Sequence, residues 1–254
     1  MIERSSKKYL EKNKAWLEIA IEEGVRFFIT ALGNPDWVTK RLADVEGATV
    51  FHDVTERKWA EKALSANVDG LICVNNRAGG HAGRLSPQAL FDELHTLGLP
   101  LICAGGIGGP KAYQDALGIG YAGVQLGTRM IATTECSAHD DYKQAILTAE
   151  ETDIALTKKI TGVPVSVIQT EYMKQRGLQT SRLANWFLHS PRTKHLTRLF
   201  YSLRSLWQLR QSNKQGSQYK EFYQAGKSVS EIKTILPVQG VINTIIGQQP
   251  KGTK

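Results

Sequence analysis

Five short apolar runs alternate with amphipathic stretches through the first half of the chain, and this alternation limits the fold more than any other feature. The runs are almost continuously hydrophobic, as parallel strands covered on both faces are. They span residues 25–33, 48–54, 68–75, 100–107 and 122–128. Apolar residues recur at helical spacings of three and four in residues 35–45, 55–67, 87–98 and 109–120. The succession predicts repeated βα units, in an α/β barrel or a doubly wound sheet.

The residues that end the apolar runs favour the barrel. They are short polar or glycine-rich stretches, and barrels build their active sites from the C-terminal ends of their strands. The last two runs end in AGGIGGP and QLGTR, at the place where barrels often bind phosphate. We therefore predict an α/β fold, a partial TIM (β/α)8 barrel of about five βα units, whereas a closed barrel has eight.

Charge divides the 254-residue chain into an almost balanced front and a basic back. Residues 1–150 hold 16 Lys and Arg against 19 Asp and Glu, whereas residues 151–254 hold 16 against 5. We assign residues 1–150 to the partial barrel. Residues 151–246 are expected to form a smaller, mostly helical, basic lid or substrate domain with a closing helix. The polar tail, residues 247–254, is expected to be disordered.

One stretch of the basic part has the pattern of an amphipathic helix. Residues 194–211, KHLTRLFYSLRSLWQLRQ, place leucine, phenylalanine and tryptophan on one stripe. Such a helix can bind a membrane surface, nucleic acid or an acidic carrier. The simpler interpretation packs the stripe onto the barrel as part of the lid and leaves the charges solvated. No nucleic-acid-binding motif accompanies the charge, so nucleic acid is not the expected partner.

Composition indicates a globular protein without a membrane span. The chain is 41% hydrophobic, and no apolar run reaches the roughly 18 residues that cross a bilayer. The charged N-terminus lacks the apolar core of a secretory signal, which indicates a cytosolic protein. Cys73, Cys103 and Cys136 lie far apart without a CxxC spacing, so we expect neither a disulfide framework nor a metal site.

Several motifs together carry a family resemblance. They are GGHAGRLSP, LICAGGI, GVQLGTRMIATTECSAHDDYKQAIL, TKKITGVPVSVI and FYQAGKSVSEI. From about residue 15 to 246, the sequence resembles the nitronate monooxygenase (2-nitropropane dioxygenase-like) flavoproteins. The resemblance implies an FMN-dependent barrel with a smaller domain inserted near its C-terminus. The family's N-terminal portion, including the first barrel strands, has no counterpart in this sequence.

The resemblance makes His81 the catalytic base. An imidazole with an ordinary pKa of about 6.5 can remove a proton from a carbon acid at neutral pH, and nitroalkanes are unusually acidic carbon acids. The alternative is a loop histidine that serves only as a hydrogen-bond partner. The glycines around His81 let the backbone approach a flat cofactor closely, because no Cβ intervenes.

Backbone amides and one hydroxyl are the expected FMN ligands, again by resemblance. The alternative is that these residues only form the tight turns that follow strands, which require glycine in any case. The expected cofactor-binding residues are Gly79, Gly80, Gly105, Gly106, Gln125, Leu126, Gly127 and Thr128.

The sequence departs from the family's pattern before the histidine loop. Val74 stands where many relatives have a glutamine that helps to hold FMN, and Arg77 stands where relatives commonly have an acid. Asn75 and Asn76 can supply amide hydrogen bonds to substrate instead, although turn formation explains them equally well. These departures bear on the substrate more than on the cofactor.

Two further histidines are left outside the expected mechanism. His52, at a strand end, is interpreted as a structural histidine. His139 is expected at the start of a helix that Ser137 caps.

The resulting expectation is an FMN-dependent oxidoreductase that oxidises alkyl nitronates or nitroalkanes with oxygen. Its expected partners are a small-molecule substrate and oxygen, and the sequence is compatible with a homo-oligomer. A second interpretation is a flavin-dependent enoyl-acyl-carrier-protein reductase, which shares a GGH loop and would dock an acidic carrier. A third is an inactive fragment whose basic helix binds nucleic acid or a membrane.

Overall fold

The computed structural model describes residues 7–157, 164–170 and 223–247. The stretch 194–211 and the tail beyond residue 247 lie outside these residues. The chain forms two compact units. Met1–Asn75, Gly83–Ala104 and Ala116–Gln125 form the first, called the sheet unit. Asn76–Ala82, Gly105–Asp115 and Leu126–Lys254 form the second, called the loop unit.

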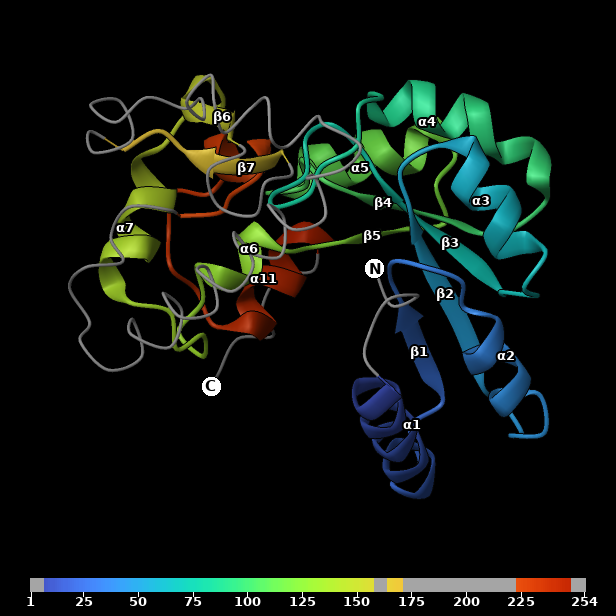
Figure 1. Ribbon diagram of the computed structural model, residues 1–254. Helices are drawn as coiled ribbons and strands as arrows, with labels where there is room; N and C mark the ends of the chain where they lie inside the picture. The colour runs from blue at the N-terminus through green and yellow to red at the C-terminus, as the bar shows by residue number, and fades with distance from the viewer. Residues whose placement is uncertain (1–6, 158–163, 171–222, 248–254) are drawn as a thin grey trace, which may run out of the picture. The chain divides into compact units, whose positions relative to one another are not determined.

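The sheet unit contains five parallel strands that follow one another in chain order (Figure 1). Consecutive strands pair in parallel throughout the sheet. A doubly wound sheet would reorder its strands around a switch point, whereas a barrel keeps them in sequence. The predicted partial barrel is therefore confirmed. The strands are β1 (Phe27–Thr30), β2 (Thr49–Val54), β3 (Gly70–Val74), β4 (Leu101–Ala104) and β5 (Gly123–Gln125).

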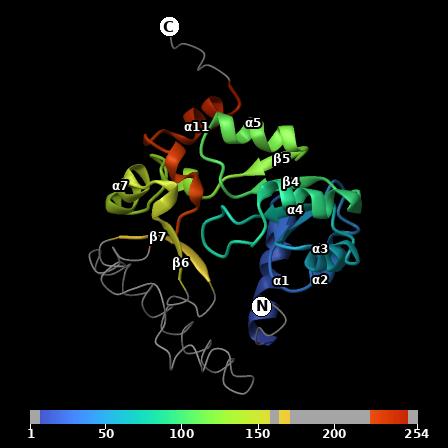
Figure 2. The same ribbon diagram turned by 90° about the horizontal axis from the view of Figure 1, so that it is seen from above.

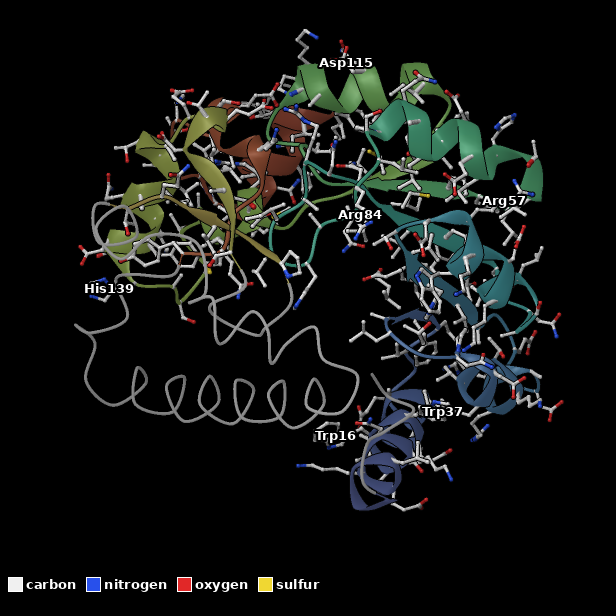
Figure 3. The ribbon with its side chains drawn as sticks, turned by 45° about the horizontal axis from the view of Figure 1, so that its top comes forward. Trp16, Trp37, Arg57, Arg84, Asp115 and His139 are labelled. Carbon is white, nitrogen blue, oxygen red and sulfur yellow. The ribbon has the colours of Figure 1, made fainter. Side chains whose placement is uncertain are left out.

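Helices separate the strands, as the apolar spacing predicts. Ser86 caps α4 (Pro87–Leu94), because its Oγ accepts a hydrogen bond from the Ala89 amide at 3.2 Å and Pro87 opens the helix. Arg57 links α3 (Arg57–Leu64) to α4, because its amide donates to Glu93 Oε1 of α4 at 2.6 Å; its side chain is labelled in Figure 3. The helices are α1 (Lys7–Glu22), α2 (Asp36–Leu42), α3 (Arg57–Leu64), α4 (Pro87–Leu94), the 3-10 turn η2 (His95–Leu97) and α5 (Pro110–Ile119), whose first residues belong to the loop unit.

The two faces of the sheet differ in burial. Alternate residues of β2, beginning at Val50, are buried. On the other face, Phe27 and Ile29 of β1 are 55% and 52% exposed, and the Phe51 ring lies 5.2 Å from that of Phe27. The expectation of cover on both faces is thus wrong for the first strands. Five strands leave the inner face open at β1, whereas the side chains of eight fill the interior of a closed barrel.

The loop unit has its own buried cluster. Ile146, Val229 and Ile232 are fully buried in it, and the rings of Tyr142 and Tyr223 stack with centroids 4.6 Å apart. Figure 2 shows the antiparallel pair β6–β7 beside α7 in this unit. The elements are α6 (Thr128–Ile131), α7 (Asp140–Thr148), η3 (Glu151–Asp153), β6 (Ile154–Thr157), β7 (Val165–Ile168), η4 (Lys227–Glu231) and α11 (Val238–Ile245).

His52 and His139, the two histidines left outside the expected mechanism, have structural contacts. His52 is buried, its Nδ1 lies 2.8 Å from Thr30 Oγ1, and burial and then the charge of Lys62 lower its pKa. His139 itself caps α7, since its Nδ1 accepts from the Asp141 amide at 3.2 Å (Figure 3). The predicted Ser137 cap is therefore wrong, because the helix begins only at Asp140.

None of the helices in the described part of the chain has both the length and the hydropathy that a bilayer-spanning helix requires.

Candidate functional site

The histidine loop, residues 76–82, follows β3 directly and belongs to the loop unit. The Gly80 carbonyl accepts from the Ser166 amide of β7 at 2.8 Å and from the Ala82 amide at 3.0 Å, which fixes the backbone on both sides of His81. His81 itself is exposed, yet desolvation by the surrounding protein lowers its pKa below the ordinary imidazole value. The ring is therefore neutral at neutral pH and able to accept a proton.

Glycines allow this loop to touch a distant segment through the backbone. A Cβ placed on Gly79 would lie 2.8 Å from the Gly226 nitrogen, and one on Gly226 would lie 2.6 Å from the Arg77 carbonyl oxygen. The Lys227 amide donates to that same oxygen at 2.9 Å. Since real Cβ contacts are longer than this, glycine is required at both positions for the close approach. Gly79 thus has a packing role beside any role in binding a cofactor.

The turn after β4 needs glycine for its conformation. Gly105 and Gly106 have φ values of 120° and 85°, in a region that side chains rarely adopt. A Cβ on Gly106 would lie 2.5 Å from Arg77 Nε, so the arginine side chain lies against this glycine. Further along, the Gly108 amide donates to Glu231 Oε2 at 3.3 Å.

The QLGT turn after β5 combines an anchored residue with open space. Thr128 is buried and its Oγ1 accepts from the Gly226 amide at 2.9 Å. A Cβ on Gly127 would meet no atom within 4 Å. Arg129, which follows, is only 4% exposed; its Nη1 donates to the Thr234 carbonyl at 2.9 Å, while Nη2 has no partner among the described residues. Burial lowers the pKa of this guanidinium.

Residues 225–231 (AGKSVSE) contact all three turns, and the sequence interpretation missed this role. Gly226 meets the histidine loop and Thr128, and Glu231 meets Gly108. The segment is about 145 residues away from the histidine loop along the chain. The small residues Ala-Gly before Lys227 were the available signal, and they entered the interpretation only as part of the family resemblance.

The loop unit therefore holds most of the expected site, while Asn75 and Gln125 belong to the sheet unit. Asn75 is fully buried in the sheet unit, where its Nδ2 lies 3.5 Å from Cys103 Sγ and its amide donates to the Ala104 carbonyl at 3.0 Å. This side chain has a structural contact where a substrate contact was expected. Gln125 is exposed at the end of β5, and Asn76 is exposed at the start of the loop. The loop unit contains Gly79, Gly80, His81, Gly105, Gly106, Leu126, Gly127 and Thr128.

One titratable residue of the sheet unit was not foreseen. Asp53 lies on the inner face of β2, beside Ile72 of β3, and its Oδ1 is buried without a hydrogen-bond partner among the described residues. Burial raises its pKa from 3.8 to about 6. A single carboxyl in an apolar strand run carries no sequence signal for this, because the shift depends on the atoms that pack around it.

The fold is that of an α/β-barrel protein in which glycine-rich turns follow β3, β4 and β5, and the turn after β3 carries His81. The chain belongs to the nitronate monooxygenase family, which matches residues 3–248. A nitronate monooxygenase of Paraburkholderia phytofirmans is 32% identical over 158 residues, which cover 58% of this chain and 43% of that protein. The (3aS,4S,5R,7aS)-5-hydroxy-7a-methyl-1-oxo-octahydro-1H-indene-4-carboxyl-CoA dehydrogenase of Mycobacterium tuberculosis is 31% identical over 163 residues, covering 63% of this chain and 46% of that one.

Solved structures show the same fold. FabK from Thermotoga maritima superposes with a TM-score of 0.73 at 25% identity, covering 91% of this chain and 70% of that one. A nitroalkane oxidase from Streptomyces ansochromogenes superposes with a TM-score of 0.74 at 20% identity, covering 93% of this chain and 67% of that one. The chain spans a little under half the length of the two curated relatives.

Proposed function

We propose that this chain carries the cofactor-binding turns and the proton-abstracting base of an FMN-dependent oxidoreductase that oxidises alkyl nitronates or nitroalkanes with oxygen. The observation that carries the proposal lies within one compact unit: residues 225–231 contact the histidine loop, the glycine turn after β4 and the QLGT turn. Family membership supports the reaction class.

The QLGT turn has features that fit a flavin phosphate. The space at Gly127 is open, so a ligand can approach its backbone. Arg129 brings a buried cation with an unpartnered Nη2 close in sequence to that glycine, and a buried charge favours a compensating anion. Bound FMN would supply the chemistry of taking an electron from the nitronate and passing it to oxygen. We propose that Gly79, Gly80, Gly105, Gly106, Gln125, Leu126, Gly127 and Thr128 hold it.

His81 would act on the neutral nitroalkane. Because its pKa is lowered, the neutral imidazole is the main form at pH 7, and it can take the proton from the carbon next to the nitro group. The hydrogen bonds to the Gly80 carbonyl hold the loop backbone while the ring stays accessible. A substrate added as the preformed nitronate has already lost this proton and needs no base.

The test compares these two substrates. Purified protein should stay yellow after it is mixed with FMN and unbound FMN is removed. His81→Ala should lower kcat/KM on the nitroalkane by about a hundredfold, the usual range for a lost general base, while keeping most activity on the nitronate. In the parent protein, activity on the nitroalkane should fall as acid protonates His81. His139→Ala, which removes an exposed helix cap, is the matched control. Equal losses on both substrates would exclude His81 as the base. Protein that is colourless once unbound FMN has been removed would leave the inactive-fragment interpretation.

A second function, a flavin-dependent enoyl-thioester reductase, is favoured by the comparisons with thioester enzymes. The Mycobacterium tuberculosis relative is named for a carboxyl-CoA compound, and the enoyl reductase domain of MlnA shares the fold with a TM-score of 0.66 at 12% identity. Oxidation of NAD(P)H that depends on an enoyl thioester and not on a nitronate would establish this function in place of the first.

A further inference from the structure

Arg77, the second residue of the histidine loop, makes a two-pronged ion pair. Its Nη1 donates to Glu151 Oε1 at 3.0 Å and its Nη2 to Glu151 Oε2 at 2.8 Å. Glu151 belongs to η3, and Lys227 Nζ lies 3.2 Å from the same carboxylate. Burial alone would raise the pKa of Glu151, but the hydrogen bonds from Arg77 and Lys227 bring it below the ordinary value. The fork fixes the direction of the guanidinium as well as its distance.

The rest of Arg77 touches two other segments of the loop unit. Its carbonyl accepts from the Lys227 amide at 2.9 Å, which ties the loop to the start of η4. Its side chain covers Gly106, where a Cβ would lie 2.5 Å from Nε and 2.9 Å from the arginine Cβ. One residue therefore joins the histidine loop to η3, to η4 and to the glycine turn after β4.

This anchoring matters because only three residues, two of them glycines, lie between Arg77 and the histidine. Ala78, Gly79 and Gly80 separate Arg77 from His81, and a glycine backbone has more conformational freedom to lose than any other, so contacts at both ends of this segment limit how far it can move. A half-exposed ion pair adds little to the free energy of unfolding. A fixed end, however, restricts the positions that a ring four residues further along can sample, and a misplacement of about 1 Å can cost a catalyst a hundredfold.

We propose that Arg77, held by Glu151, is a positioning residue that fixes the histidine loop against the Gly105–Gly106 turn and so sets the place of His81. The inference rests on the proposed role of His81 as the base. It goes beyond that role because it assigns a task to a residue outside the base and the expected cofactor-binding turns.

The experiment uses Arg77→Met and Glu151→Gln, which break the fork from opposite ends. Arg77→Met keeps an unbranched stem that reaches about as far as Nε, and Lys227 still partners Glu151, so that carboxylate is not left alone. Each variant should lower kcat on a neutral nitroalkane by about tenfold or more. KM and the turnover of the nitronate should stay within about twofold of the parent values. The double variant should lose no more kcat than either single variant, because both changes break the same contact. Lys111→Met, which breaks the exposed Lys111–Asp115 pair of α5, should change nothing beyond twofold.

A spectroscopic measurement separates this inference from the proposed function. The His81 imidazole is titrated by NMR in the protein without substrate, where Arg77→Met and Glu151→Gln should raise its pKa toward the ordinary value by releasing the ring into solvent. An unchanged titration in both variants would overturn the positioning role even if His81 is the base. A shifted titration with no change in nitroalkane turnover would support the positioning role of Arg77 and exclude His81 as the base. Arg77→Lys, which keeps the charge without the fork, should behave like Arg77→Met.

Discussion

The two units differ in how completely they bury their apolar side chains. Among the described residues, twelve large apolar side chains are exposed, of which nine belong to the sheet unit and three to the loop unit. Six of the nine lie between Trp16 and Leu32, on α1, on β1 and in the turns beside them. The loop unit instead closes its cluster around Ile146, Val229 and Ile232, each 0% exposed.

This difference shows that the fold of the sheet unit and the geometry of the candidate site depend on different interactions. Backbone pairing holds the sheet unit together even where its inner face meets water, because the ladder of parallel strands does not depend on that face. The candidate site depends on close packing, since its turns meet backbone to backbone at Gly79 and Gly226. Equivalent substitutions should therefore have different costs in the two units.

The largest expected difference concerns one aliphatic residue in each unit. Ile146→Ala should lower the free energy of unfolding by about 2–5 kcal/mol, because it removes a fully buried side chain and leaves a cavity. Ile29→Ala should cost under about 1 kcal/mol, because that side chain is 52% exposed. Urea unfolding of both variants measures the two values. Similar losses would show that something covers β1 in solution and that the contrast between the units is small.

Two glycines with equally short contacts give the next effect. A Cβ at Gly226 would lie 2.6 Å from backbone atoms, whereas one at Gly70 would lie 2.3 Å from the outer atoms of the Phe51 ring. Gly226→Ala should cost about 1–3 kcal/mol and displace the histidine loop, because backbone cannot move aside cheaply. Gly70→Ala should cost less than Gly226→Ala, since the ring can turn away over the open face. Thermal unfolding compares them, and a larger loss for Gly70→Ala would contradict the open inner face.

The smallest expected effect depends on pH and concerns the sheet unit alone. Asp53 has a folded-state pKa of about 6 against 3.8 for the free group, so the folded form holds its proton more tightly. Its ionisation therefore destabilises the fold progressively as pH rises from about 4 to about 6, and the loss then stays constant. Asp53→Asn should raise the free energy of unfolding by about 1–2 kcal/mol at pH 7.5 and by almost nothing at pH 3.5. An equal gain at both pH values would show that charge is not the cause.

Local pattern predicted the βα succession of the sheet unit well. Each predicted strand contains an observed one, for example residues 48–54 around β2 and 68–75 around β3. The observed elements are shorter because propensity does not show where the ladder or the helix frays. The helix α1 was not predicted, because its charged stretch has no strong apolar stripe. In the structure its Trp16 is exposed (Figure 3), and so is Ile19.

Long-range contacts could not be predicted in the same way. The expected amide ligand Asn75 lies fully buried against Cys103, because the register of β3 and β4 decides which strand-end side chains point inward. The ion pair of Arg77 with Glu151 joins residues 74 positions apart, and neither residue belongs to a recognisable motif. The charge of a residue in the sequence does not reveal which residue it pairs with in the fold.

The sequence alone determined the order of strands and helices, the place of His81 between glycines and the family, because periodicity and motifs are local properties of the chain. The tertiary structure decided which glycines serve close packing, how residues 225–231 contact three turns, and that burial raises the pKa of Asp53 to about 6. These features depend on atoms that are remote in sequence and adjacent in space, and burial and contact exist only once the chain has folded.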